Sequence, residues 1–542
     1  MTALAGTVLI GGAALYLRWW DRYVEDGLTQ WAVSEVARRT DSAYRLVLGD
    51  LDFHPLQGSL AFDSAVLLTD TLKSMGHAAP LPTVRARASG CVLSGVNAWR
   101  LFRRASFDAR EMGCQSVVAG IVLSAIREDS AAKAPDTLGI NRPTAPLPRP
   151  LGLSRFRIGK ISFPALSFVM TRPGRSGNAE VIVEHARLSA EKLDFDPTAP
   201  PGTRRALSAT KVQLNATGMV VRPDTLSEMS IGRLHAGITD STLRLDSAAL
   251  GPSISDDEWV KSQRYRHDRI RFSLDSLQAR GVRYRALLWT GDIVMRALDV
   301  RGAKLDVLTD KRLPVRGRPK HRSPQEVTRE MDHAFKVDTA IVEQSEIVYR
   351  ERKADRPRPG RVSFDSVRAR IVNLHLPTSG APLEIEAKAR LMNQGWLEVK
   401  GSVPLAAPDF RFALTGQLGP MPATALNQFL AEAENIKFGS GQVDRIDFEL
   451  KASNGFVVAR VTPRYRNLSV DVTGKGGGVI GSVKRAVVEF AANAFKVRSD
   501  NPEGEGKAAR SARASRPYNP EHSWIQFLWF GTRDGLKEVI LK

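Results

Sequence analysis

The sequence lacks the residue patterns on which most enzymes and metal proteins are built. It has two cysteines and nine scattered histidines among 542 residues, and no HExxH or CxxC motif occurs. No Walker A sequence or GxSxG elbow is present. The glycine-rich run 474–478 lacks the GK[ST] ending of a phosphate loop, so it predicts a turn. We therefore expect no catalytic residue, no metal site and no cofactor.

Cysteine is too scarce for a disulfide framework or a zinc site. Cys91 and Cys114 are compatible with one bridge or with two buried free thiols.

Acidic residues are outnumbered by basic ones, and the formal net charge is +20. This balance favours anionic partners such as nucleic acid, acidic lipid head groups or lipopolysaccharide. The arginines are spread along the whole chain, as they are on a solvated surface. The basic stretch 312–322 has no interleaved aromatic residues, so we expect no nucleic-acid partner.

The first twenty residues read as a membrane anchor. Residues 2–17 carry no charge, and as a helix they would span ~24 Å at ~1.5 Å per residue. A cleaved signal peptide is the alternative, but no small-x-small site follows the apolar run. We expect residues 1–20 to be a transmembrane helix whose membrane and interface residues include Leu4, Leu9, Leu15, Trp19 and Trp20.

The orientation of this anchor is open. Arg18 and Arg22 follow the apolar run and no basic residue precedes it, so the positive-inside rule would leave the large domain in the cytoplasm. A start assigned too far downstream would remove a basic segment and mislead this count.

The body of the chain alternates apolar and polar residues with the period of two that marks β-strands. Residues 21–40 predict an amphipathic helix, and residues 41–480 predict an elongated β region with loops near 128–150 and 308–323. Short helices are expected at 95–104, from Asp256, and from Ser323. The polar alternate positions suit a solvated outer face. We therefore expect a mostly β protein, with one long, curved antiparallel sheet forming a groove.

Residues 481–542 predict a strand, a basic linker and an amphipathic helix. The linker, 499–517, reads as a flexible loop because it is rich in Ala, Pro, Arg and Ser. Two interpretations of the aromatic helix remain open, an interfacial membrane helix and a cap on the open edge of the sheet. Its candidate interface residues are Trp524, Phe527, Trp529 and Phe530.

Several segments, taken in order, resemble the AsmA-like (AsmA/TamB-type) bacterial envelope proteins. The anchor and amphipathic helix lead into residues 46–56 and 58–60, which match a pair of strands with the pattern φxφ…φxφxPxxGxL. Residues 85–122 and the later stretches 421–441 and 465–468 continue the likeness. The resemblance implies an inner-membrane anchor, a periplasmic β-groove and a role in phospholipid transport or outer-membrane assembly. It supplies no catalytic residues.

We therefore expect a single-pass bacterial inner-membrane protein with its bulk in the periplasm. Its candidate partners are the membrane, a phospholipid or other envelope lipid lying in the groove, and an envelope protein. The alternatives are a structural or regulatory scaffold that binds a protein partner and, third, a membrane-anchored hydrolase.

Overall fold

The structure is a computed structural model of the chain, and it divides into two compact units, Met1–Asp240 and Ser241–Lys542. Side chains 524–528 fall outside the description, as do the predicted anchor, 1–20, and residues 97–104 of the predicted helix 95–104. The described residues are 25–30, 32–34, 36–38, 40, 42–54, 57–70, 82–96, 106–122, 155–172, 178–195, 207–289, 291–317, 321–331, 333–377, 380–472, 497–519 and 524–541.

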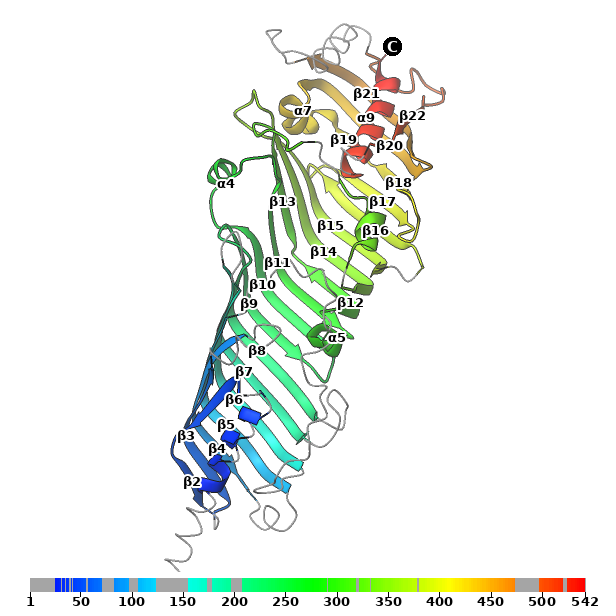
Figure 1. The fold of residues 1–542 in the computed structure, drawn as a ribbon. Coiled ribbons are helices and arrows are strands. Elements are labelled where there is room, and N and C mark those ends of the chain that lie inside the picture. Colours follow the sequence, from blue (N-terminus) through cyan, green and yellow to red (C-terminus); the bar gives the residue numbers. More distant parts are fainter. Residues whose placement is uncertain are drawn as a thin grey trace, which may run out of the picture. The chain divides into compact units, whose positions relative to one another are not determined.

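Unit 1 is a β-sheet preceded by a helical stretch within residues 25–38 (Figure 1). Leu28 of that stretch is buried in the same apolar cluster as Phe53 and Ile158, and Glu25 accepts a hydrogen bond from the Phe53 N–H at 2.9 Å. The helix therefore covers one end of the apolar face of this sheet. The strands of unit 1 are β1 (Tyr44–Leu48), β2 (Leu51–His54), β3 (Ser59–Thr69), β4 (Thr83–Ser94), β5 (Ser106–Val122), β6 (Arg155–Arg172), β7 (Ala179–Phe195), β8 (Leu207–Arg222) and β9 (Ser227–Gly237).

The part of the sheet in unit 2 is curved and carries five described α-helices (Figure 1). Its elements are β10 (Thr242–Pro252), α4 (Asp256–Ser262), β11 (Arg269–Arg280), α5 (Tyr284–Trp289), β12 (Ile293–Arg301), β13 (Lys304–Asp310), α6 (Pro324–Arg329), β14 (Phe335–Arg352), β15 (Gly360–Leu376), β16 (Leu383–Leu391), β17 (Gly395–Val403), β18 (Phe412–Leu418), β19 (Met421–Pro422), the 3₁₀-helix η1 (Ala423–Leu426), α7 (Asn427–Ala433), β20 (Ile436–Ser453), β21 (Phe456–Val472), β22 (Ala512–Pro517) and α9 (Trp524–Ile540).

The predicted mostly β fold with short helices is confirmed, but the prediction of a purely antiparallel sheet is wrong. In unit 1, β5 pairs with β6 in parallel, and in unit 2 both β12 and β13 pair with β14 in parallel. Every other strand pair within the two units is antiparallel among the described residues. A parallel pair needs a long crossover rather than a hairpin turn, and residues 123–154 and 311–334 provide the two crossovers.

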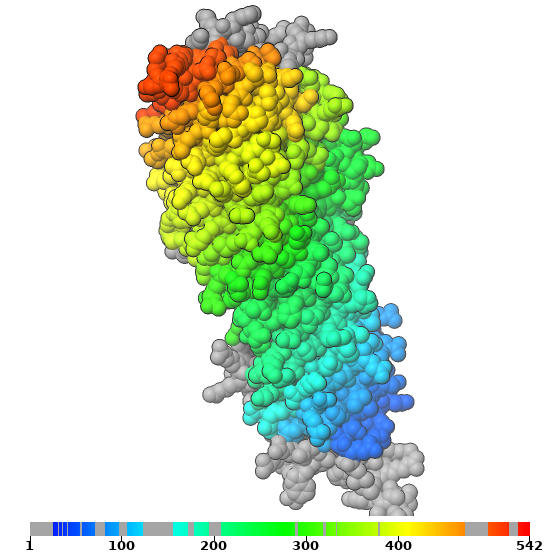
Figure 2. Space-filling model, turned by 180° about the vertical axis from the view of Figure 1, so that it is seen from behind, coloured from blue at the N-terminus to red at the C-terminus, as the bar shows by residue number. Residues whose placement is uncertain are grey.

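Most strands therefore pair with their neighbours in the sequence. In Figure 2, the surface of unit 2 passes from green through yellow to orange and red, which is the order of its strands along the chain. The second crossover carries α6, which is held in place by side-chain contacts to the β17–β18 loop. Buried Gln325 donates to the Arg411 carbonyl at 2.7 Å, and Arg329 donates to the Ala407 carbonyl at 3.1 Å.

Local sequence signals explain the helix starts that were predicted. Ser255 and Glu258 form a capping box at the start of α4, and Ser323 and Glu326 form another at α6, where Pro324 occupies the first turn. The stretch 499–517, in contrast, is not only a loop. It contains β22, which extends the sheet by pairing with β21.

The two cysteines form a disulfide. Cys91 and Cys114 are direct partners on the antiparallel strands β4 and β5, and their Cα atoms are 3.9 Å apart. The bridge therefore joins two adjacent strands of unit 1 at one register position.

Left-handed residues interrupt the long strands of unit 2. Ser247, Gly302, Gln344 and Ser366 have φ between 51° and 65°. At each of these residues the apolar side chains change from even-numbered to odd-numbered positions of the strand, or the reverse. On β14, for example, Ala340 and Val342 precede Gln344, whereas Ile347 and Tyr349 follow it. An extra residue of this kind shifts the alternation by one, so apolar side chains stay on the same face of a long strand.

We expect Gly302→Ala to lower the free energy of unfolding by about 2–3 kcal/mol, because a Cβ is unfavourable at φ +65° and would lie 2.0 Å from Asp275 Oδ2. Gly317 is the matched control, since it has φ +58° and no atom within 4 Å of its Cβ position. Gly317→Ala should cost about 1 kcal/mol, measured as the shift in the midpoint of chemical denaturation. Equal losses in the two variants would contradict the argument.

Candidate functional site: an apolar sheet face closed by the last helix

The apolar face of unit 2 consists of paired residues that continue across the whole sheet. Two neighbouring rows contain only apolar residues and glycine, and each row crosses eleven strands, which is ~48 Å at ~4.8 Å per strand. The first row is Leu243, Ala279, Leu298, Ala340, Ile371, Ile385, Gly401, Leu414, Leu450, Ala459 and Ala514. The second row is Leu245, Leu277, Val300, Val342, Ala369, Ala387, Val399, Gly416, Phe448, Val461 and Ala512.

A third row lies between these two, and its side chains are on the opposite, polar face of the sheet. Nearly all its members are charged or polar, and Lys400 bonds Glu386 within it at 3.1 Å. The next polar position of the same two strands has a second such pair, Lys388 with Glu398 at 2.7 Å. The intervening row is Arg244, Gln278, Asp299, Ile341, Arg370, Glu386, Lys400, Thr415, Glu449, Arg460 and Arg513. The sheet is thus amphipathic, with one face suited to water and the other to hydrocarbon.

Beyond the left-handed residues the apolar face continues with large side chains open to solvent. Leu250, Ile270 and Ile347 are 40%, 50% and 37% exposed. They belong to further rows of paired apolar residues that include Phe272, Leu305, Val307, Tyr349, Val362, Phe364 and Leu391. Scattered exposed apolar residues are ordinary, but a continuous apolar surface marks an interaction site.

Unit 1 has an apolar face of the same kind. One row there is Leu67, Ala86, Ala119, Phe168, Val183, Met219 and Ile231, and the next is Ala65, Ala88, Val117, Leu166, Ala186, Ala216 and Leu234. At one end this face is covered by the helical stretch that carries Leu28. The two units are therefore built on the same principle.

Helix α9 covers the last strands of the apolar face of unit 2. A Cβ built on Gly531 would lie 3.1 Å from Ala459, and one on Gly535 would lie 2.8 Å from Val461, so the helix backbone touches the sheet. An ion pair of 2.6 Å between Arg516 of β22 and Asp534 holds it in place.

Of the four predicted interface residues in α9, the structure places the side chains of two. Trp529 packs edge-to-face on Phe429 of α7, with ring centroids 6.0 Å apart, and its indole N–H donates to Glu434 at 3.3 Å. Phe530 lies between two guanidinium groups, those of Arg516 and Arg533. Trp524 and Phe527 belong to the first turn of α9, but their side chains are outside the description.

Leu4, Leu9, Leu15, Trp19 and Trp20 also lie outside the described residues, and no helix among the described ones is both long and apolar enough to cross a membrane. The predicted cap on the sheet edge is close to what is observed, although α9 packs on the face of the terminal strands. The interfacial role of its aromatic residues stays a prediction.

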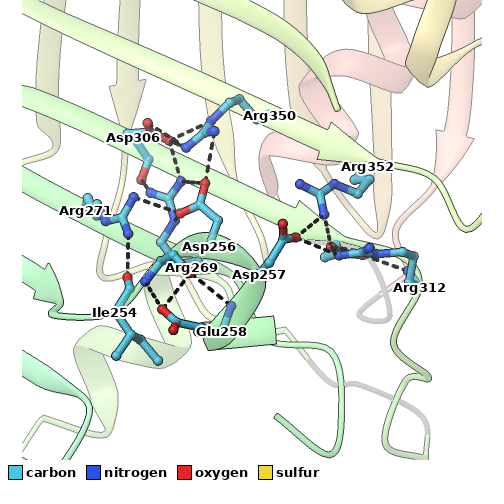
Figure 3. Close-up of polar contacts among 12 residues, drawn as sticks. Ile254, Asp256, Asp257, Glu258, Arg269, Arg271, Asp306, Arg312, Arg350 and Arg352 are labelled. Atoms are coloured by element: carbon cyan, nitrogen blue, oxygen red, sulfur yellow. Dashed lines mark hydrogen bonds and ion pairs between the residues drawn. The ribbon is translucent and has the colours of Figure 1, made fainter. Parts of the chain in front are cut away.

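A buried ion-pair network lies on the opposite face of unit 2, where α4 meets β11, β13 and β14 (Figure 3). Its centre is Arg269, which is 0% exposed and pairs with Asp256 at 3.0 Å and with Asp306 at 3.1 Å. Arg350 bonds the same two carboxylates, and Arg271 joins Asp256 at 2.8 Å.

A second group of ions continues from this network (Figure 3). Asp257 bonds Arg352 at 2.8 Å, and these contacts hold the pKa of the Asp257 carboxyl below its usual range. Arg312 pairs with Asp310 at 2.7 Å and reaches Asp257 at 3.4 Å. Every carboxylate of the two groups is engaged by at least one arginine, so the arrangement fits a clamp that fastens α4 to three strands. Sequence reasoning identified Asp256 and Asp257 as a helix start but gave no signal for their partners.

Outside these features, the described residues offer little that resembles a reaction centre. A cavity of 390 Å³ opens on β15–β18 beside the exposed charged residues Arg370, Glu384 and Lys400. Among the described residues no three His, Cys, Asp or Glu side chains are grouped to hold a metal ion.

Comparison with known proteins does not identify a family for this chain. No family model matches the chain, and no curated protein matches it.

We expect Arg269→Met to lower the free energy of unfolding by about 3 kcal/mol, because it leaves Asp256 and Asp306 short of a buried partner. Arg244→Met is the control, since Arg244 is exposed and pairs only with Asp246 on its own strand; it should cost at most about 1 kcal/mol. Thermal and chemical denaturation would measure both, and a small loss for Arg269→Met would show that the network is not a clamp.

We expect Gly535→Leu to displace α9, since the new side chain would overlap Val461 and overpacking costs about 1–3 kcal/mol. Faster proteolysis within residues 497–541 and increased binding of an apolar fluorescent dye would report the displacement. Glu538→Leu adds the same side chain at an exposed position of the same helix. If Glu538→Leu had the same effect as Gly535→Leu, the cause would be the added apolar side chain and not the loss of contact between α9 and the sheet.

Proposed function

We propose that the chain is a bacterial inner-membrane-anchored protein with its bulk in the periplasm, and that it supports outer-membrane assembly by carrying or shielding lipid on the apolar faces of its sheets. The observation that carries this proposal is the pair of uninterrupted apolar rows across eleven strands of unit 2. The segments that resemble AsmA-like proteins point to the same function.

The dimensions and energetics of the apolar face suit acyl chains. A bilayer core of ~30 Å holds two layers of lipid tails, so one tail is ~15 Å long, about a third of the ~48 Å length of each row. Each CH₂ removed from water contributes ~0.8 kcal/mol, hence on the order of 10 kcal/mol for a full tail. Transfer of a lipid from a bilayer to the sheet therefore avoids a large cost in free energy only if the sheet face covers most of the tail.

The disulfide supports the proposed location of unit 1. Disulfides persist in oxidising compartments such as the periplasm and are rare in the cytosol. Cys91 and Cys114, paired across β4 and β5, therefore favour a periplasmic body over the cytoplasmic placement suggested by Arg18 and Arg22.

A scaffold that binds a protein partner is the second candidate. It is favoured by α9, which already fills the end of the apolar face with side chains of the chain itself. Lipid binding elsewhere on the face distinguishes the two candidates.

We expect the double variant Ile270→Glu/Ile347→Glu to abolish uptake of a fluorescent phospholipid from vesicles by the purified full-length protein. Both side chains are at least a third exposed, so charging them should cost little stability while placing two carboxylates where tails would lie. Unchanged thermal unfolding would confirm that the variant is folded.

The matched control is Gln278→Glu/Thr415→Glu, which adds two carboxylates at exposed positions of the polar face. This variant should take up lipid as the unmodified protein does. Lipid uptake that survives in both variants, or none by the unmodified protein, would refute the lipid proposal and favour the scaffold.

A further inference from the structure

A chain of aromatic rings crosses from the apolar face of unit 2 to its covering helices. Tyr349 on β14 lies 6.2 Å from Phe429 on α7, and Phe429 lies 6.0 Å from Trp529 on α9, measured between ring centroids. Tyr349 belongs to the row that includes exposed Ile270. The aromatic chain therefore marks the rim where the open part of the apolar face meets α7 and α9.

Basic side chains gather at this rim around a single carboxylate. Glu434, which follows α7, accepts from the Trp529 indole and pairs with Arg533 at 3.5 Å. Lys353, just beyond the end of β14, and Lys537 on α9 both interact electrostatically with Glu434. Three cations thus share this carboxylate.

Neither lysine has a close partner in the described part of the chain. Lys353 and Lys537 are about half-buried, and neither ammonium makes a hydrogen bond or ion pair with a described residue. Burial lowers the pKa of both, and Arg533 lowers the pKa of Lys537 further. Charged groups that are partly buried without a bonded counter-ion oppose folding, which is common where a protein binds a charged ligand.

The nearby acidic groups do not remove this excess of positive charge. Asp534 is bound to Arg516 at 2.6 Å and also contacts Arg533 at 3.5 Å, and Glu351 is bound to Lys311 at 2.5 Å. Asp355 acts on Lys353 only electrostatically. Glu434 is bonded to Arg533, and among the described residues Asp355 forms no ion pair with either lysine, so both ammonium groups are left without a bonded carboxylate.

We propose that Lys353, Lys537 and Arg533 bind the phosphate of an anionic lipid head group whose tails lie on the apolar face of unit 2. This inference rests on the proposed function and adds a class of lipid to it. A phosphate oxyanion accepts several charge-assisted hydrogen bonds, which two ammonium groups and a guanidinium can donate. The tryptophan and tyrosine at the rim suit the boundary between head group and tail.

The test uses the full-length protein and phosphatidylcholine vesicles that contain either fluorescent phosphatidic acid or fluorescent diacylglycerol, which has the same tails without phosphate. We expect the unmodified protein to prefer phosphatidic acid and Lys353→Gln/Lys537→Gln to lose at least about tenfold of that preference, equivalent to ~1.4 kcal/mol. Uptake of diacylglycerol should be unchanged. The variant should also unfold at a higher temperature, because two unfavourable charges are gone.

Lys388→Gln/Lys400→Gln is the matched control, because it removes two positive charges from ion pairs on the polar face. This control variant should keep the preference for phosphatidic acid. An equal loss of preference in the control would show that the effect comes from the overall charge of the protein, and would overturn the proposal. Uptake of both lipids without preference overturns the head-group site but leaves the proposed function standing. Uptake of neither lipid overturns both.

Inorganic phosphate, titrated calorimetrically, separates the two sources of the anion. Saturable phosphate binding that is lost in Lys353→Gln/Lys537→Gln, with no preference for phosphatidic acid, would assign the site to free phosphate and overturn the lipid head group.

Discussion

The structure depends on keeping every apolar side chain of a long strand on the same face of the sheet. Side chains alternate with period two, so one extra residue moves all later ones to the wrong face. In unit 2 the strands tolerate such a shift because Ser247, Gly302, Gln344 and Ser366 change parity together at neighbouring positions. The apolar rows beyond these four residues, and the position of the arginine clamp on the opposite face beneath α4, require this coordination.

In unit 2 the polar face of the sheet contributes to stability, whereas the apolar face is the proposed binding surface. The polar face carries cross-strand ion pairs, which are exposed and contribute little individually. Arg269 at the centre of the clamp is different, because it is fully buried and cannot exchange its partners for water. Stability is thus concentrated behind the sheet, so the other face can leave Ile270 and Ile347 uncovered.

Sequence alone predicted the β fold, the one-sided alternation and the capped helix starts, because these depend on neighbouring residues. It missed the two parallel pairings, since the sequence of neither crossover shows the 3.6-residue periodicity of a long helix that would mark a βαβ unit. It took the segment that holds β22 for a loop, because Arg513 and Arg516 hide the alternation there. The contacts of Arg350 in the clamp and of Glu434 with its lysines join residues 44 to 103 positions apart, and no local pattern indicates such contacts. The anchor stays a prediction.

The near-sequential pairing of strands also governs how the chain acquires its structure. A hairpin can form as soon as its second strand leaves the ribosome or a translocation pore, and each new strand then adds to an existing edge. The crossovers at 123–154 and 311–334, like the connection 473–511 before β22, are points where assembly must wait for a distant partner. Between them, β7–β9 and then β10–β12 can accumulate one at a time, so apolar rows lengthen progressively and little unpaired sequence is exposed at any moment.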